Sequence, residues 1–172
     1  WSRFSEAFRE YPFHVRYVYR GPSQYGPANL LYAKPTGYHA TMVGFPYDDV
    51  AGWRGIYPAE VLGSQFAIMA SGWQKGLSAF GAALDKIEEP DKRATALGDF
   101  GVAQAISLHF DSVAKQIEFA AARESLLSGS LSQAERNRLQ REHDEATRLL
   151  EQQRAMLADL EALRAEGRAG LG

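Results

Sequence analysis

The stretch that decides the fold runs from Pro58 to Pro90 and reads PAEVLGSQFAIMASGWQKGLSAFGAALDKIEEP. Its large apolar residues recur every three or four positions, a spacing that places side chains on one face of an α-helix. Pro58 suits the first position of a helix, Glu60 complements the positive end of the helix dipole, and Pro90 ends this helix or begins another. The sequence therefore predicts one long helix between the two prolines. Its apolar stripe is Leu62, Phe66, Met69, Trp73, Leu77, Phe80, Leu84 and Ile87.

Two further helices are predicted after Pro90. The first ends near Ser128-Gly129-Ser130, and the second begins after Ser132, because Ser132 and Glu135 have the spacing of a capping box. Long helices with short connections pack antiparallel. We therefore expect the helices of residues 59–127 to form a hairpin around Trp73, with a third helix beside it. The second stripe is Val102, Ile106, Phe110, Val113, Ile117 and Ala120, and the third is Leu139, Ala146, Leu150, Leu157 and Leu160, with His143 and Gln153 at two further stripe positions.

Residues 1–58 have a different composition, rich in Tyr, Phe, Pro and Gly. Apolar and polar side chains alternate over residues 13–20, which predicts a strand. A second short strand is predicted from His39 to Phe45, entered through the turn signal Lys34-Pro35-Thr36-Gly37. The expected fold is mainly α, with a small α/β segment over residues 1–58 and a region of three long helices, resembling a three-helix bundle, over residues 59–172.

Charge and composition exclude several classes of partner. Nineteen basic and 21 acidic residues leave a net charge of −2, so attraction to nucleic acid or to anionic lipid is not expected. No apolar run can span a bilayer and no signal peptide is present, so we expect a soluble protein, cytoplasmic rather than secreted. The absence of Cys and the scattered positions of the four His argue against a metal site, and no cofactor motif is present. Because the chain begins at Trp1 without Met, we expect a piece of a longer protein.

The loop GFPYDDVAGWRGIYP, residues Gly44–Pro58, carries the strongest candidate for a ligand site. Aromatic rings stack on the apolar faces of sugars, while carboxylates, amides and guanidinium groups bind sugar hydroxyls or carboxylates. If both strands are parallel, the loops that follow them lie at the same edge of a sheet, where α/β proteins bind ligands. The predicted carbohydrate-binding residues are Tyr47, Asp48, Asp49, Trp53 and Arg54 of this loop and Tyr25 and Asn29 of the preceding one.

A structural explanation of the same loop stays open. Asp48 and Asp49 are common turn formers, and Arg54 would then be their structural partner. A catalytic role for the two adjacent carboxylates is less favoured, since the acid and the nucleophile of glycoside hydrolases normally come from separate elements.

The segment YGPANLLYAKPTGYHATMVGFPYDD, followed by WRGIYP, QF and GWQKGL, resembles the C-terminal part of large bacterial proteins related to glycoside hydrolases. These contain a (β/α)₈ barrel of the α-glucuronidase or hexosaminidase type followed by a helical region. The resemblance is concentrated in residues 19–77. It implies that residues 13–58 close a barrel and that the catalytic carboxylates lie on earlier strands, outside this chain.

Three functions follow as hypotheses. The first is a C-terminal piece of a carbohydrate-active protein that contributes substrate contacts. The second is a structural or oligomerising helical interaction module without catalytic activity, whose third helix binds a partner helix. The third is a small enzyme that uses Asp48 or Asp49. Whether the chain is part of an enzyme is therefore left open by the sequence.

Overall fold

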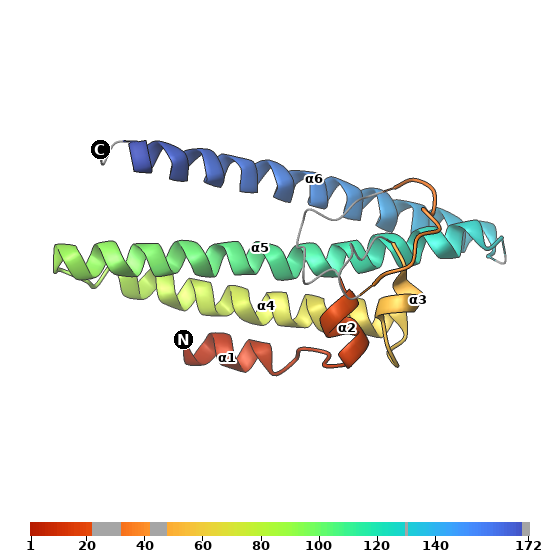
Figure 1. Cartoon of the computed structure of the whole chain (residues 1–172), viewed down its shortest axis with the longest axis horizontal. Coiled ribbons are helices and arrows are strands. Elements are labelled where there is room, and N and C mark those ends of the chain that lie inside the picture. The colour runs from red at the N-terminus through yellow and green to blue at the C-terminus, as the bar shows by residue number, and fades with distance from the viewer. Residues whose placement is uncertain (22–31, 42–47, 130, 170–172) are drawn as a thin grey trace.

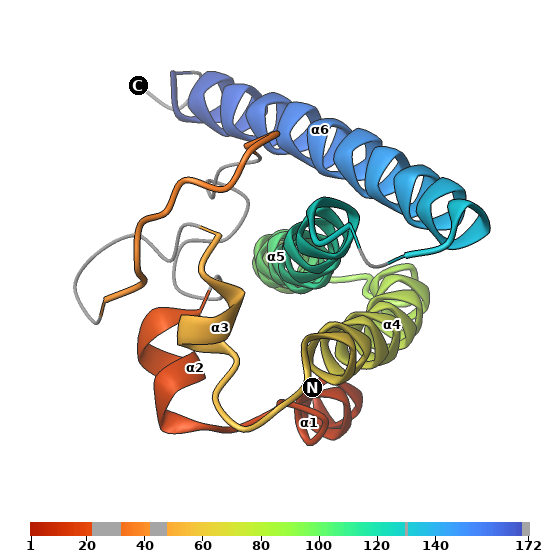
Figure 2. The ribbon, with the colours of Figure 1, turned by 90° about the vertical axis from the view of Figure 1, so that its right-hand side faces the viewer.

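The computed structural model describes residues 1–21, 32–41, 48–129 and 131–169. Within these ranges the chain is helical, and the four longest helices run side by side along the long axis of the molecule (Figure 1). The two shortest, α2 and α3, lie together at one end and to one side of them (Figures 1 and 2). The helices are α1 (Ser2–Phe8), α2 (Val15–Arg20), α3 (Val50–Trp53), α4 (Ala59–Leu84), α5 (Pro90–Leu127) and α6 (Gln133–Ala169).

The α4–α5 hairpin forms the centre of the fold, as the sequence predicts. Pro58 precedes the first residue of α4 and Pro90 is the first residue of α5, so the two prolines mark the helix starts. Trp73 of α4 is 7% exposed, and its indole N–H donates a hydrogen bond of 2.8 Å to the carbonyl of Ala103 on α5. Its ring meets that of Phe110 edge to face. The two apolar stripes therefore face each other around Trp73.

Helix α1 packs against α4 through a small-residue face that the sequence analysis did not single out. A Cβ atom at Gly76 would lie 2.6 Å from the ring of Phe4, and one at Gly72 would lie 2.9 Å from the Cβ of Ala7. Glycine at both positions lets the backbones approach closely. The Phe4 ring then lies 4.5 Å from the Trp73 ring, so α1 extends the aromatic core.

Helix α6 begins at the predicted capping box. The Ser132 hydroxyl accepts from the Glu135 amide at 3.4 Å, while the Glu135 carboxylate accepts from the Ser132 amide at 3.0 Å. The helix packs mainly on α5, where Leu150 is 1% exposed. The predicted stripe is confirmed at Leu150 and at the half-buried Leu139; the side chains of Ala146, Leu157 and Leu160 lie outside the described part.

The predicted strand over residues 13–20 is wrong, because Val15–Arg20 form α2. A helix pairs backbone groups within itself, whereas a lone strand would need a neighbour that the described residues do not provide. The second predicted strand is likewise absent over residues 39–41, where the Ala40 amide donates to the Asp49 carboxylate at 2.8 Å. Residues 42–45 of that prediction lie outside the described ranges. The described part of residues 13–58 therefore contains no strand of a barrel end.

The packing corrects the expected burial of Val102 and shows how far the hydrophobic core extends. Val102 was expected to be buried in the second stripe but is 57% exposed. The hydrophobic core also runs across the predicted boundary at residue 58, since Phe4, Val50 and Trp53 pack in the same cluster as residues of α4 and α5. None of the described helices is both long and apolar enough to pass through a membrane.

Candidate functional site

Asp48 lies in the core-facing part of the predicted binding loop. Its carboxylate accepts from the Thr36 amide at 3.0 Å and from the Thr36 hydroxyl at 2.5 Å, and Arg123 of α5 approaches it to 2.6 Å through Nη2. Both side chains of the ion pair are almost fully buried, at 4% exposure for Arg123 and 6% for Asp48. Arg123 also donates to the carbonyl of Tyr32 at 2.8 Å. Through these hydrogen bonds and this ion pair, residues 32–36 and the segment before α3 are held against α5.

The electrostatics of Asp48 agree with a charged structural role. Burial alone raises its pKa, but the hydrogen bonds from Thr36 and the charge of Arg123 outweigh burial, so the pKa lies below its ordinary value. Glu124, next along α5, behaves in the opposite way. Burial raises its pKa and the nearby Asp48 and Asp49 raise it further, against the lowering effect of Arg123.

Asp49 caps helix α3. Its carboxylate accepts from the amide of Gly52 at 3.0 Å and from the amide of Ala40 at 2.8 Å, and it lies 3.3 Å from the exposed ring of His39. A carboxylate at the N-cap satisfies amides that the helix leaves unpaired. The structural explanation of this residue is thus supported by its contacts.

Trp53 and Arg54 are also engaged within the protein. Trp53 is 1% exposed, so neither face of its ring is open for stacking on a sugar in this conformation. Arg54 donates to the carbonyl of Tyr57 at 2.8 Å. The expected partnership of Arg54 with Asp48 or Asp49 is not found among the described residues, where Arg123 is the cation of Asp48.

Tyr25, Asn29 and Tyr47 of the predicted site lie outside the described residues. Of the predicted site residues, Asp48 pairs with Arg123 of α5, Asp49 caps α3 and Trp53 is buried in the core, while Arg54 donates to the Tyr57 carbonyl. Binding of a carbohydrate by the seven predicted residues stays a prediction.

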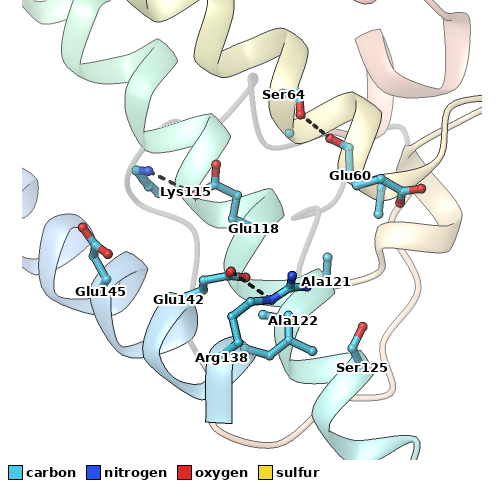
Figure 3. A pocket seen from close by; sticks show the side chains of 13 residues that line it. Glu60, Ser64, Lys115, Glu118, Ala121, Ala122, Ser125, Arg138, Glu142 and Glu145 are labelled. Atoms are coloured by element: carbon cyan, nitrogen blue, oxygen red, sulfur yellow. Dashed lines mark hydrogen bonds and ion pairs between the residues drawn. The ribbon is translucent and has the colours of Figure 1, made fainter. Parts of the chain in front are cut away.

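A groove that the sequence analysis did not identify lies where the start of α4, the second half of α5 and the start of α6 meet (Figure 3). Its volume is about 530 Å³. Small residues from α4 and α5 line it, and charged side chains from all three helices surround them (Figure 3). The small residues are Ala59, Gly63, Ser64, Ala121, Ala122 and Ser125; the charged ones are Glu60, Lys115, Glu118, Arg138, Glu142 and Glu145.

Ion pairs in this groove form within single helices. Lys115 lies 3.1 Å from Glu118 on α5, and Arg138 lies 3.4 Å from Glu142 on α6 (Figure 3). Among the described residues no ion pair joins the groove's walls to one another.

For the Arg123–Asp48 pair, the sequence does contain a signal, which can be recognised once the fold is known. Arg123 follows Ala120 at helical spacing, so a cation there falls on the buried face and requires a buried partner. The groove has no such signal, because Glu60 and Glu145 are 85 positions apart and border one groove only when α6 folds back along α5. The described residues contain no group of three or more His, Asp or Glu side chains placed to hold a metal ion.

Comparisons with protein-family models, with curated proteins and with solved structures found no match to this chain.

Proposed function

We propose that this chain is a helical interaction module without catalytic activity, which docks a partner helix in the groove between α4, α5 and α6. The observation that carries the proposal is the contrast between the two candidate sites. The described side chains of the aromatic loop are occupied by internal contacts, as Asp48 is by Arg123 and Thr36. The groove, by comparison, is a concave surface of about 530 Å³ with exposed side chains.

The dimensions of the groove favour a helix as its occupant. It extends along α5 from Lys115 to Ser125. At 1.5 Å per residue this corresponds to about 15 Å, or roughly three turns of a docked helix. Small, partly exposed residues in the groove such as Ala121 and Ser125 allow the close interaxial distances of about 8–10 Å at which helices pack. α6 forms one wall of the groove, so a helix docked there would contact the third helix.

The aromatic loop has a structural part in this proposal. Asp48 joins Thr36 to Arg123 of α5, near the end of the hairpin where the groove lies, and Asp49 joins Ala40 to the start of α3. A groove formed before the partner arrives would lower the ordering cost of binding.

The test is a titration of the isotopically labelled full chain, followed by amide NMR signals. The ligands are a set of stapled helical peptides of acidic, neutral and basic composition and a panel of neutral and acidic oligosaccharides. We expect at least one peptide class to shift amides of residues 59–64, 115–125 and 138–145, and no oligosaccharide to shift residues 48–57. Shifts at residues 48–57 with oligosaccharides, and none with any peptide, would overturn the proposal in favour of carbohydrate binding.

Two serines on α4 provide a matched pair of variants for this test. Ser64 lies in the groove and Ser78 outside it, both are exposed, and each donates to the carbonyl four residues earlier. Ser64→Phe should fill the groove and abolish the peptide-induced shifts, whereas Ser78→Phe should leave them unchanged. Equal effects of the two variants would place the peptide elsewhere.

A further inference from the structure

The charges of the groove identify the chemistry of its partner. Four carboxylates and two cations line it, Glu60, Glu118, Glu142 and Glu145 against Lys115 and Arg138. Lys115 and Arg138 are each paired with a carboxylate of their own helix. Among the described residues Glu60 and Glu145 have no ion-pair partner, so the groove has an excess of negative charge on both its α4 and α6 walls.

The placement of these carboxylates favours several separate positive charges over one metal ion. The described carboxylates do not gather into a group that could chelate a metal. Glu60 stands on α4 and Glu145 on α6, with α5 between the two helices (Figure 3). An occupant that neutralises both must therefore carry cations at two points across its width.

The small-residue floor adds a second requirement. Ala59 and Ala121, both partly exposed, offer no polar side chain, so the surface that contacts them is best matched by apolar side chains of modest size. A helix with Ala or Leu on one face and Lys or Arg on the two flanks of that face meets both requirements. Within each flank its cations would lie three or four positions apart, the spacing of neighbours on one side of a helix.

We infer that the groove formed by α4, α5 and α6 binds a basic amphipathic helix, with Glu60 and Glu145 accepting Lys or Arg side chains from the two flanks of the bound helix. The inference rests on the proposed function and adds to it the charge and the shape of the partner.

The probe is a stapled Ala-rich peptide of about 20 residues, long enough to cover the groove, with Lys on both flanks of its Ala face. Matched peptides carry Gln or Glu in place of every Lys. The staple holds all three helical, so that differences in affinity report charge. Binding is measured with the full chain by fluorescence anisotropy, and its location by amide NMR. We expect the Lys peptide to bind in the groove, the Gln peptide more weakly and the Glu peptide not at all.

Two variants of the chain test the assigned carboxylates. Glu60→Gln combined with Glu145→Gln should weaken binding of the Lys peptide about tenfold, as the loss of two partly exposed ion pairs allows. Glu151→Gln, on an exposed position of α6 outside the groove, is the control and should leave the affinity unchanged. Affinity for the Lys peptide should also fall as ionic strength rises from about 0.01 to about 1 M, which shortens the screening length from about 30 to about 3 Å.

The outcomes separate this inference from the proposed function. If the Gln or Glu peptide binds the groove as tightly as the Lys peptide, the inference of a basic partner is overturned while the docking function stands. If no helical peptide binds, both are overturned. If the linear polyamine spermine shifts the same amides and competes with the Lys peptide at equal concentration, the groove is a site for small organic cations and the helical partner is overturned.

Discussion

Arg123 of α5 and Asp48 of the aromatic loop form a buried ion pair with 2.6 Å between Nη2 and Oδ2. The pair connects the start of α3 to the last turns of α5, and the same guanidinium group donates to the Tyr32 carbonyl. A loop that the sequence presents as a ligand site is in this way attached to the helical core.

Replacement of Asp48 by Asn should destabilise the protein by about 3–5 kcal/mol, because it leaves the Arg123 charge buried without its counter-charge. Urea unfolding measures the loss. Asp99→Asn, on an exposed position of α5, should change the free energy of unfolding by less than about 0.5 kcal/mol. Combining Asp48→Asn with Arg123→Met should recover part of the stability, since no buried charge remains. A loss below about 1 kcal/mol in the single variant would contradict the importance of the pair.

The pH dependence of stability should carry the signature of Asp48. Its folded-state pKa lies below the ordinary value of 3.8. The stabilisation from its charge is therefore fully present above that ordinary value and is lost as the pH falls through the folded-state pKa. Urea unfolding of the wild type and of Asp48→Asn between about pH 6 and pH 2 should show a difference in stability that narrows below about pH 4. A difference independent of pH would rule out the carboxylate charge as its source.

Asp111 at the contact of α5 with α6 should have the opposite dependence. Burial raises its pKa above the ordinary value of 3.8, although Lys115 and the Gln153 amide, which donates a hydrogen bond to it, act to lower the pKa. Its favourable contribution is thus present below the unfolded-state pKa and is lost as the pH rises through the folded-state pKa.

Asp111→Asn resembles the protonated side chain at every pH, so it should strengthen attachment of α6 at pH 7. Amide hydrogen exchange over residues 141–153, corrected for intrinsic rates, should show more protection in the variant at pH 7 and little difference near pH 4. Weaker protection at pH 7 would mean that the charged carboxylate is needed as the acceptor for Gln153.

Trp73→Ala should cost about 3–5 kcal/mol in urea unfolding, because a large buried ring is removed from the centre of the hairpin. Trp73→Phe keeps an aromatic ring but removes the indole donor to the Ala103 carbonyl, which lies within α5 and keeps its helical hydrogen bond. We expect this variant to cost about 0.5–1.5 kcal/mol for the lost hydrogen bond, in addition to its smaller ring. Trp1→Ala removes a ring that is 65% exposed and serves as the control. Equal costs for Trp1→Ala and Trp73→Ala would show that Trp73 does not anchor the core.

Ser132→Ala should loosen the start of α6. The hydroxyl accepts from the Glu135 amide, and Ala has no atom to replace it. Amide exchange over residues 133–137 should become faster in the variant, whereas Ser64→Ala on α4 should leave those amides unchanged. Unaltered exchange in Ser132→Ala would show that Glu135 alone holds this helix end.

The long helices could be predicted because their signals are local. Pro58, Pro90 and the Ser132–Glu135 capping box act on the residues beside them, and the stripe through Trp73 repeats over many turns. The strand expected over residues 13–20 had only eight residues of alternation to support it. Such a short pattern does not specify whether a neighbouring strand exists, and without one α2 forms instead.

The candidate site was harder to predict because the roles of its residues depend on contacts that are not local in the sequence. Composition identified Asp48, Asp49, Trp53 and Arg54 as unusual neighbours, and the structure gives three of them buried or capping roles. Whether an aromatic ring faces solvent or core depends on what packs over it, and for Trp53 the answer is set by contacts with distant parts of the chain.

The sequence by itself determined where α4, α5 and α6 begin and which face of the hairpin is apolar, since prolines, caps and periodicity operate within a few turns of one chain segment. Only the tertiary structure decided that Arg123 is the partner of Asp48 and that Glu60 and Glu145 border one groove. Burial and charge pairing depend on distances in space, and these are fixed only when α6 folds back along α5 and the loop around Asp48 closes on the hairpin.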